Sequence, residues 1–390
     1  MRKLVANLIL LALITGAGLL ATEWAVRQVA PQVLVRGYSV PDPDLGTYVA
    51  ANADYTDPYT KEGAYRVRTN AHAFRMDEKV DLSADRRRVL VYGDSFTFGW
   101  GLELKDTYYR ALHRAARALD PRLQLLNAGV GGYASGHVKK LLERHLPAIK
   151  PAAAIYFFNS NDLIDNTITD VNYRVTAFRI GDDGRGVLDD VRPFAPWKRF
   201  LLNHTPYAWL NRHSHLFLLA KDLLKRGLAW TREIDRPVPG GGGGGADAQP
   251  AFSIDLPPLR VDDAYLARTV YVSELHVARL AAVAAAADVP LLLVWVPAPD
   301  EMFPPKAQTE TLQLLARGRR MLSRLAAETP GTFFLDTARL IPDGPAWQAQ
   351  KGTLRLSDGH FNAAGTAWFA GLVEPGVLAF LDNAVAGRAK

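Results

Sequence analysis

Mostly apolar runs alternate with amphipathic segments in two stretches of the chain, from residue 87 to 165 and from 265 to 383. Short apolar runs of this kind predict strands that are buried on both faces, at 87–93, 123–129, 152–158, 289–297 and 332–337. The segments between them repeat apolar positions with a helical period and predict helices over 107–119, 136–149, 265–287, 311–328 and 362–383. Strands that alternate with helices indicate a three-layer α/β/α sandwich with a mainly parallel sheet.

A different apolar pattern opens the chain. Residues 4–21 carry no charge and follow Arg2 and Lys3. Eighteen residues of helix span about 27 Å, close to the thickness of a bilayer core. The basic pair in front predicts a cytoplasmic N-terminus and an exported remainder. The run is longer than the apolar core of a usual signal peptide and has no clean Ala-x-Ala site after it, which favours a retained anchor over a cleaved signal. An uncharged run on every face argues against a buried core helix.

The regular pattern is interrupted twice. Residues 26–85 are rich in Pro, Asp and Tyr and predict a stalk and lead-in of turns and short extended pieces between an anchor at 1–25 and a catalytic domain at 86–390. Residues 166–260 predict a long irregular insertion in that domain. Within it, 214–230 has the spacing of an amphipathic helix, and the glycine run at 239–246 predicts a flexible spacer. The helix is expected to pack on the domain; its Lys, Arg, Leu and Trp content leaves a membrane-surface helix as the alternative.

Composition narrows the function classes. The chain has 46 Lys and Arg against 40 Asp and Glu, and the basic residues are scattered, which argues against a nucleic-acid partner. It has no cysteine, so a thiolate nucleophile, a disulfide framework and a Cys-ligated metal are excluded. The pair His213 and His215 lacks a third ligand nearby in sequence, so no metal is expected.

In open parallel sheets, ligands gather where strands end. The first strand ends in Gly-Asp-Ser, with Gly93 allowing a sharp turn before Ser95. Ser95 would then start a helix, where unpaired backbone N–H groups suit a developing oxyanion. By itself this stretch leaves two interpretations open, because Asp94 or Ser95 could serve only as a helix N-cap. The Gly-x-Ser-x-Gly elbow of α/β-hydrolases is absent.

Three later loops carry further candidate groups. The glycine-rich loop over 127–136 follows the second strand and lets backbone approach a ligand, although it could be a plain turn. Asn161 follows the third strand, and its amide could donate to an oxyanion, with Asp162 ordering the loop. Asp358 and His360 precede the last helix, where a carboxylate could orient an imidazole as general base or simply cap that helix.

Together these loops supply a nucleophile, a base, an orienting acid and oxyanion donors at one sheet edge, as acyl transfer requires. The four stretches, GDSFTFG, NAGVGG, NSND and SDGHFN, resemble the four blocks of the SGNH/GDSL hydrolase superfamily, over residues 85–165 and 285–380. The segment TNAHAFR resembles the lead-in of membrane-anchored bacterial members.

The resemblance implies a flavodoxin-like sheet, Ser95 as nucleophile, His360 as base and Asp358 as its orienting acid. It also implies an oxyanion hole from the Ser95 and Gly132 N–H groups and the Asn161 side chain, and no cofactor. Ser160 stands where many members have glycine. The last block reads Asp-x-His rather than Asp-x-x-His, as in members that act on exported polysaccharide; Asp336 is therefore kept as a second candidate for the orienting acid.

The chain is expected to be a serine esterase. It is expected to cross the bacterial inner membrane once, through residues 4–21, with its catalytic domain in the periplasm or outside the cell. The expected substrate is an acylated small molecule or glycan, with O-acetyl esters favoured. Two alternatives remain: a glycan O-acetyltransferase that uses the same acyl-enzyme, and a non-catalytic glycan-binding or assembly protein. The sequence does not fix the oligomeric state.

Overall fold

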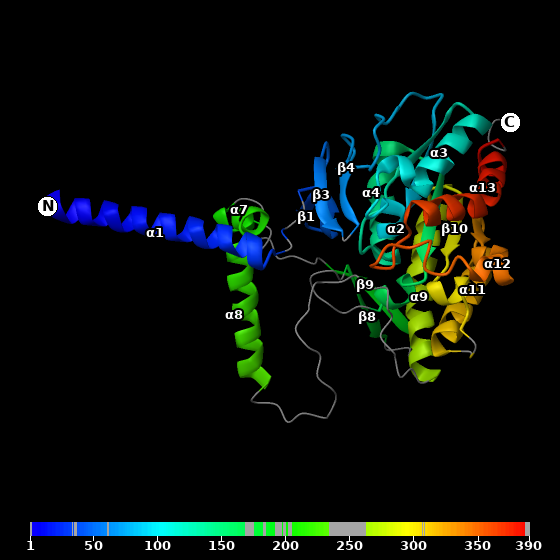
Figure 1. Cartoon of the computed structure of the whole chain (residues 1–390). Coiled ribbons are helices and arrows are strands. Elements are labelled where there is room, and N and C mark those ends of the chain that lie inside the picture. The colour runs from blue at the N-terminus through cyan, green and yellow to red at the C-terminus, as the bar shows by residue number, and fades with distance from the viewer. Residues whose placement is uncertain are drawn as a thin grey trace. The chain divides into compact units, whose positions relative to one another are not determined.

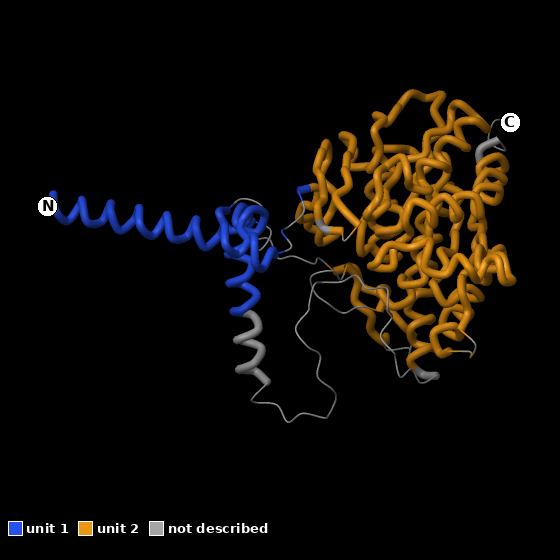
Figure 2. The backbone as a smooth tube through the Cα atoms, viewed as in Figure 1, with its two compact units in different colours: residues 1–37, 196–251 blue, residues 38–195, 252–390 orange. Residues whose placement is uncertain are grey.

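The computed structural model describes two compact units (Figure 2). Unit 1 comprises residues 1–37 and 196–251, and unit 2 comprises residues 38–195 and 252–390. The residues whose placement is described are 2–32, 34, 37–60, 62–167, 175–181, 185–191, 197, 200–201, 205–233, 263–305, 307 and 309–386. The predicted glycine spacer at 239–246 lies outside them.

Unit 2 is built on a five-stranded sheet (Figure 1). Its strands are β5 (Arg87–Tyr92), β6 (Leu123–Asn127), β7 (Ala153–Asn159), β10 (Leu291–Val296) and β11 (Thr332–Leu335). All neighbouring pairs are parallel, in the order β11-β10-β7-β5-β6. Numbered along the chain, that order is 2-1-3-4-5 read from β6, which is the flavodoxin-like order. The predicted strands and the predicted fold class are confirmed.

Helices cover both faces of the sheet. The longer ones are α3 (Tyr108–Leu119), α4 (Ser135–Ile149), α9 (Asp263–Ala286), α11 (Glu310–Glu328) and α13 (Ala363–Ala386). Helix α3 packs against α13, while α4 packs against α9 and α9 against α11. The described part of unit 2 also contains short helical turns: α2 (Ser95–Phe98), η1 (Leu104–Asp106), α5 (Asp162–Asp165), α10 (Pro299–Met302), η2 (Thr337–Leu340) and α12 (Pro345–Gln348).

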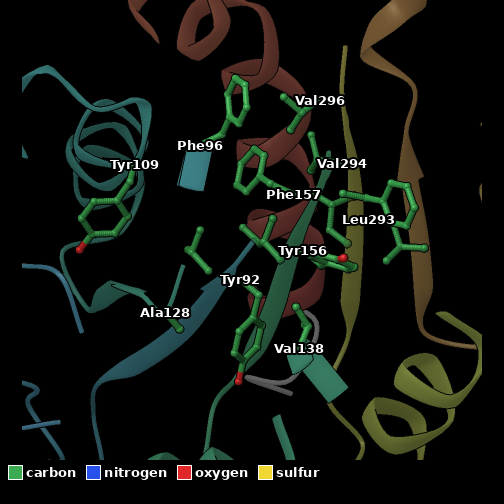
Figure 3. Packing of buried hydrophobic residues seen from close by; sticks show 14 of the residues in the cluster. Tyr92, Phe96, Tyr109, Ala128, Val138, Tyr156, Phe157, Leu293, Val294 and Val296 are labelled. Atoms are coloured by element: carbon green, nitrogen blue, oxygen red, sulfur yellow. The ribbon is translucent and has the colours of Figure 1, made fainter. Parts of the chain in front are cut away.

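Strand β7 shows why the sheet has helices on both sides (Figure 3). Every residue of β7 is buried, and successive side chains of a strand point to opposite faces. Phe157 contacts Tyr108 of α3 and Phe369 of α13. Its neighbour Tyr156 is 3.1 Å from the hydroxyl of Ser135 on α4. Two apolar faces therefore need two helical layers, and the three-layer arrangement follows.

Among the described residues, three antiparallel hairpins lie outside the main sheet: β1 (Ser39–Asp42) with β2 (Gly46–Val49), β3 (Asp54–Thr60) with β4 (Gly63–Arg68), and β8 (Thr176–Ile180) with β9 (Gly186–Asp190). Residues 38–85 belong to unit 2, and Tyr65, Phe74 and Met76 join its core. The sequence predicts turns and short extended pieces over 26–85 and an irregular insertion from 166; it does not indicate the pairing of these strands, because they are short and have no sustained apolar period.

Unit 1 contains α1 (Arg2–Val29), α7 (Pro206–His213) and α8 (His215–Glu233), and α8 contacts both other helices. Helix α8 confirms the amphipathic helix predicted at 214–230. Two described helices are long and apolar enough to cross a membrane, α1 and α13. Helix α13 contributes Val373 and Val377 to the core of unit 2 and is a core helix. Helix α1 has no buried residue among those described and is the candidate membrane helix.

Candidate active site

The turn after β5 places Ser95 at the start of α2. Gly93 has φ of +157°, and a Cβ there would lie 2.0 Å from the Thr97 hydroxyl, so only glycine fits. Asp94 caps α2, because its Oδ1 accepts from the Phe96 N–H at 2.9 Å. The capping role considered for Ser95 therefore falls to Asp94, and the Ser95 hydroxyl is available for another partner.

That partner is His360. The Ser95 Oγ lies 2.7 Å from His360 Nε2, although the two residues are 265 positions apart. Ser95 is 7% exposed and His360 3%, so little water reaches the pair. Because His360 sits in the loop before α13 and Ser95 in the loop after β5, only the folded sheet brings them together. The arrangement puts a basic imidazole nitrogen directly on a serine hydroxyl.

Asp358 lies on the other side of the imidazole. Its Oδ1 is 3.1 Å from His360 Nδ1, at ion-pair distance, and Nδ1 makes no hydrogen bond in the described part of the chain. Oδ1 also accepts from the His360 backbone N–H, and Oδ2 accepts from Trp100 Nε1 at 2.8 Å. Burial raises the pKa of Asp358, but the charge of His360 and the hydrogen bonds from the His360 backbone N–H and the Trp100 indole outweigh it and hold that pKa below its ordinary value. Asp358 is therefore ionised at neutral pH.

The second candidate acid has other partners. Asp336 accepts from Arg319 at 3.1 Å and from Arg339 at 3.0 Å. Asp358, and not Asp336, is thus the carboxylate that the structure places against His360.

The glycine loop after β6 docks against α2. Asn127 donates from Nδ2 to the Thr97 carbonyl and accepts from the Gly129 N–H, each at 3.0 Å. A Cβ on Gly129 would lie 2.5 Å from the Phe98 nitrogen, so the loop approaches α2 at backbone distance. Further along, a Cβ on Gly131 would lie 3.9 Å from the Ser95 Cβ, and Gly132 has φ of +76°. Gly132, the predicted glycine of the oxyanion hole, therefore directly follows Gly131, which lies beside Ser95.

Asn161 is held by a carboxylate that the sequence interpretation did not single out. Its Nδ2 donates to Asp165 Oδ2 at 2.7 Å, and its buried Oδ1 has no partner in the described part of the chain. An amide nitrogen carries two N–H groups, so the second is available to a ligand or to Asp94, whose pKa Asn161 lowers. Asp165 lies four residues after Asn161, at the far end of the single-turn helix α5.

Two buried carboxylates, Asp94 and Asp162, and the partly buried Asp165 lie close enough at this edge to influence one another's pKa. Asp94 accepts from Asn159 Nδ2 at 3.1 Å, and Asp162 accepts from the Tyr156 hydroxyl at 2.7 Å. Burial raises the pKa of both Asp94 and Asp162, and the negative charge of Asp94 adds to the effect on Asp162. Burial, followed by the charge of Asp94, raises the pKa of Asp165 to about 7.

This raised pKa predicts a pH dependence of stability. The folded chain holds a proton on Asp165 that the unfolded chain releases near its ordinary pKa, so the free energy of unfolding should fall as pH rises from about 4 to 7. The slope from one such group is at most about 1.4 kcal/mol per pH unit. Asp165→Asn should flatten the curve relative to wild type, as measured by urea unfolding at several pH values. Asp343→Asn, at an exposed position, is the control; a D165N curve that follows D343N would contradict the assignment.

A buried arginine fixes the chain just after α2. Arg75 is 1% exposed, and its guanidinium donates to the carbonyls of Phe98, Gly99 and Leu102 at 2.5–2.6 Å and of Arg66 at 3.2 Å. It forms no ion pair with any carboxylate in the described part of the chain, and burial lowers its pKa. Arg75 thus holds the segment that carries Trp100. It lies in TNAHAFR, and nothing in that local sequence indicates a buried arginine.

A second arginine, which is partly buried, fixes the histidine loop. Arg355 donates to the Gly359 carbonyl at 2.6 Å and to the Pro297 carbonyl at 3.2 Å, and its guanidinium lies 4.7 Å from the centre of the Phe361 ring. Burial lowers the pKa of Arg355 to about 10. His360 itself packs against Phe96, with ring centres 4.9 Å apart, and Trp100, at 5.9 Å. The base is therefore held by packing and by a carbonyl clamp rather than by one hydrogen bond.

No three His, Asp or Glu side chains in the described ranges are gathered as a metal site would need. His213 faces the Trp209 carbonyl, and His215 accepts from the Gln32 N–H, each at 2.8 Å.

Comparison with known proteins gave similarities only among solved structures. No family model matches, and no curated protein matches. TesA is 14% identical over 74% of this chain and 97% of its own, with a TM-score of 0.38. The psychrotrophic esterase EstA from Pseudoalteromonas sp. is 12% identical over 76% and 100%, with a TM-score of 0.39. A catalytic mutant of Axe2, an acetylxylan esterase from Geobacillus stearothermophilus, is 14% identical over 76% and 97%, with a TM-score of 0.37. The flavodoxin-like fold follows from the strand order of this sheet itself.

Proposed function

We propose that the chain is a membrane-anchored serine esterase of the SGNH/GDSL type. The observation that carries the proposal is the 2.7 Å separation of Ser95 Oγ and His360 Nε2, at the carboxyl edge of a parallel sheet and next to an ionised Asp358. A serine hydroxyl in contact with an imidazole that has a carboxylate behind it is the arrangement that nucleophilic acyl transfer needs.

In the proposed reaction, Ser95 Oγ attacks the ester carbonyl while its proton passes to His360 Nε2. The carbonyl oxygen becomes an oxyanion, which the N–H groups of Ser95 and Gly132 and the Asn161 amide stabilise. The intermediate collapses, the bond to the alcohol breaks, and His360 returns the proton to the leaving alcohol. Water then attacks the acyl-enzyme carbonyl while His360 takes its proton, and the acid leaves as His360 returns that proton to Ser95 Oγ. Asp358 orients the imidazole and stabilises its charged form.

The assignment of Asp358 predicts the effect of its amide. Asp358→Asn keeps the size of the side chain but removes the charge that favours the imidazolium, so kcat for a soluble aryl acetate should fall by about 10²–10⁴-fold. Asp336→Asn is the matched control, since Asp336 pairs with Arg319 and Arg339, and it should leave kcat within about twofold of wild type. The reverse ranking of the two variants would assign the orienting role to Asp336.

Asp165 is proposed to position Asn161, through their 2.7 Å hydrogen bond. Asp165→Leu leaves the Asn161 amide without its acceptor, and kcat should fall by about tenfold or more, in line with partial loss of one oxyanion donor. Asp165→Asn keeps a hydrogen-bond acceptor and should retain more activity than Asp165→Leu. Equal activity of D165L and wild type would remove Asp165 from the site.

The proposed substrate is an O-acetyl ester, on an exported or cell-envelope glycan. Its support is the Asp-x-His spacing, which resembles that of members acting on exported polysaccharide, together with the candidate anchor at residues 4–21. Residues 4–21 are proposed to hold the protein in the inner membrane, with the catalytic unit in the periplasm or outside the cell.

Full-length protein in detergent tests this function. It should hydrolyse a soluble aryl acetate faster than the matching octanoate, and it should release acetate from an acetylated oligosaccharide. Acetyl groups that appear on an added glycan instead of in solution would assign an acetyltransferase. Glycan binding without either reaction would contradict the esterase and favour a binding protein.

A further inference from the structure

Unit 1 ties a segment of the insertion to the end of the candidate membrane helix. Glu23 of α1 accepts from the Ser214 hydroxyl and from the backbone N–H groups of His215 and Leu216, at 2.8–2.9 Å. Arg27 pairs with Glu23 and donates to the His213 carbonyl at 2.8 Å. A carboxylate on the first N–H groups of a helix satisfies donors that have no partner inside that helix. Glu23 thus fixes where α8 begins, across more than 190 positions of sequence.

The position of Glu23 along α1 indicates at what depth in a membrane this end of the helix lies. It is the first charged residue after Lys3, so residues 4–22 form the uncharged part of α1. In a helix that crosses a bilayer, the first charge after such a run lies at the level of the headgroups. The neighbouring Trp24 is 67% exposed, as suits an indole at that level. The start of α8, bonded to Glu23, then lies at the same level.

Helix α8 leaves this point across the direction of α1 rather than along it (Figure 1). Its residues Leu216, Ala220, Leu223 and Leu224 follow the i, i+4, i+7, i+8 spacing of one helix face. Leu223 and Leu224 are 59% and 64% exposed. The other side meets α7, where Lys221 contacts Asn211 and lies 5.4 Å from the centre of the Tyr207 ring. One face of α8 is therefore packed and the other presents leucines.

We propose that α7 and α8 form a foot that lies in the headgroup region of the bilayer crossed by α1. A helix with an apolar face that runs across a membrane-spanning helix at its exit lies in the interfacial plane. Trp209 of α7 adds an exposed indole. The sequence over 197–233 holds seven Lys and Arg against two Asp and Glu, which suits anionic headgroups. Lipid is thus the occupant of the leucine face, and part of the long insertion serves as a second membrane contact beside the anchor.

Spin labels on single cysteines test the foot, because the chain has no cysteine of its own. Full-length L223C and L224C, labelled and placed in nanodiscs of phosphatidylethanolamine and phosphatidylglycerol, should show raised collision with oxygen and lowered collision with a water-soluble nickel chelate. The depth should be about 5–10 Å below the phosphates. L82C and L340C are the controls, since these leucines of unit 2 are exposed to a similar extent, 52% and 46%. Labels at these positions should show the high nickel and low oxygen accessibility of a site in water. L11C reports the anchor and should lie deep in the bilayer.

Four results separate the possibilities. Labels at 223 and 224 that read as water, with L11C deep, would overturn the foot and leave the anchor. A label at position 11 that lies at shallow depth would overturn both the foot and the membrane-spanning anchor. Labels protected from oxygen and nickel alike would show that protein covers the face, either this chain or a second copy, and would overturn the lipid contact. Glu23→Ala should make the L223C label more mobile and more accessible to nickel; an unchanged signal would overturn the role of Glu23. Hydrolysis of a soluble ester should be the same in E23A and wild type, because the proposed chemistry lies in unit 2.

Discussion

Ser95→Ala and His360→Ala should each lower kcat for a short acetyl ester by about 10⁴–10⁶-fold, and the double variant should lose no more than either single one. The reason is geometric: the two side chains are 2.7 Å apart and share one proton, so removing either partner ends the same step. Steady-state kinetics of the full-length protein in detergent, with circular dichroism to verify folding, provide the measurement.

A buried serine outside the site is the matched control. Ser273 is fully buried and donates to the Leu163 carbonyl at 3.2 Å, so Ser273→Ala removes a buried hydroxyl without touching the reaction. It should retain kcat within about twofold. Additive losses in the Ser95 and His360 double variant would contradict a shared proton transfer, and near wild-type activity of S95A would contradict the nucleophile.

Arg75→Met should produce the largest loss of stability among the substitutions considered. Methionine fills part of the volume but leaves four carbonyls without their donor, at about 1–3 kcal/mol for each buried group that finds no new partner. The free energy of unfolding should fall by about 3 kcal/mol or more. Because these carbonyls belong largely to residues 98–102, which carry Trp100, the activity of the folded fraction should also fall. Urea unfolding followed by tryptophan fluorescence measures the first effect.

Arg68→Met is the control for this experiment. Arg68 is half exposed and pairs with the half-exposed Asp77 at 3.2 Å. A surface pair of this kind contributes between 0 and about 1 kcal/mol. If R75M and R68M unfold at the same urea concentration, the carbonyl clamp does not stabilise the fold.

The central sheet could be predicted from the sequence because its strands are covered on both faces. Strand β7 has no polar position until Asn159, and β10 has none at all, so length and apolar content suffice to identify them. The order of the strands needed the structure, since an alternation of strands and helices fits several connections.

The sequence does not indicate which short segments pair as hairpins, and the reason is physical. Strands β1 and β2 have four residues each, and the alternation in β4 covers only Tyr65 and Val67. Strands β8 and β9 contain arginine or aspartate at exposed positions and gain their stability from pairing with each other. Local sequence does not reveal such pairing, so the sequence predicts an irregular insertion over residues 166–260.

The candidate site likewise contains residues that the sequence indicates and residues that it does not. Ser95, Asn161, Asp358 and His360 follow strands or precede a helix in recognisable local patterns, and the sequence singled them out. Their supporting residues lie elsewhere: Arg75 is 20 residues before Ser95, and Trp100 reaches Asp358 across 258 positions. Asp165 reads locally as one more polar residue of a turn. Contacts formed only by the fold carry no local signal, and for that reason these three were not predicted.

In the proposed mechanism, Ser95 is a nucleophile that His360 activates. Reaction of the full-length protein with a fluorophosphonate probe, followed by mass spectrometry of the peptides, tests it directly. We expect one covalent adduct, on the peptide that contains Ser95, and its loss in both S95A and H360A while S273A is labelled like wild type. Folded wild-type protein that forms no adduct, or an adduct that persists in S95A, would contradict the account.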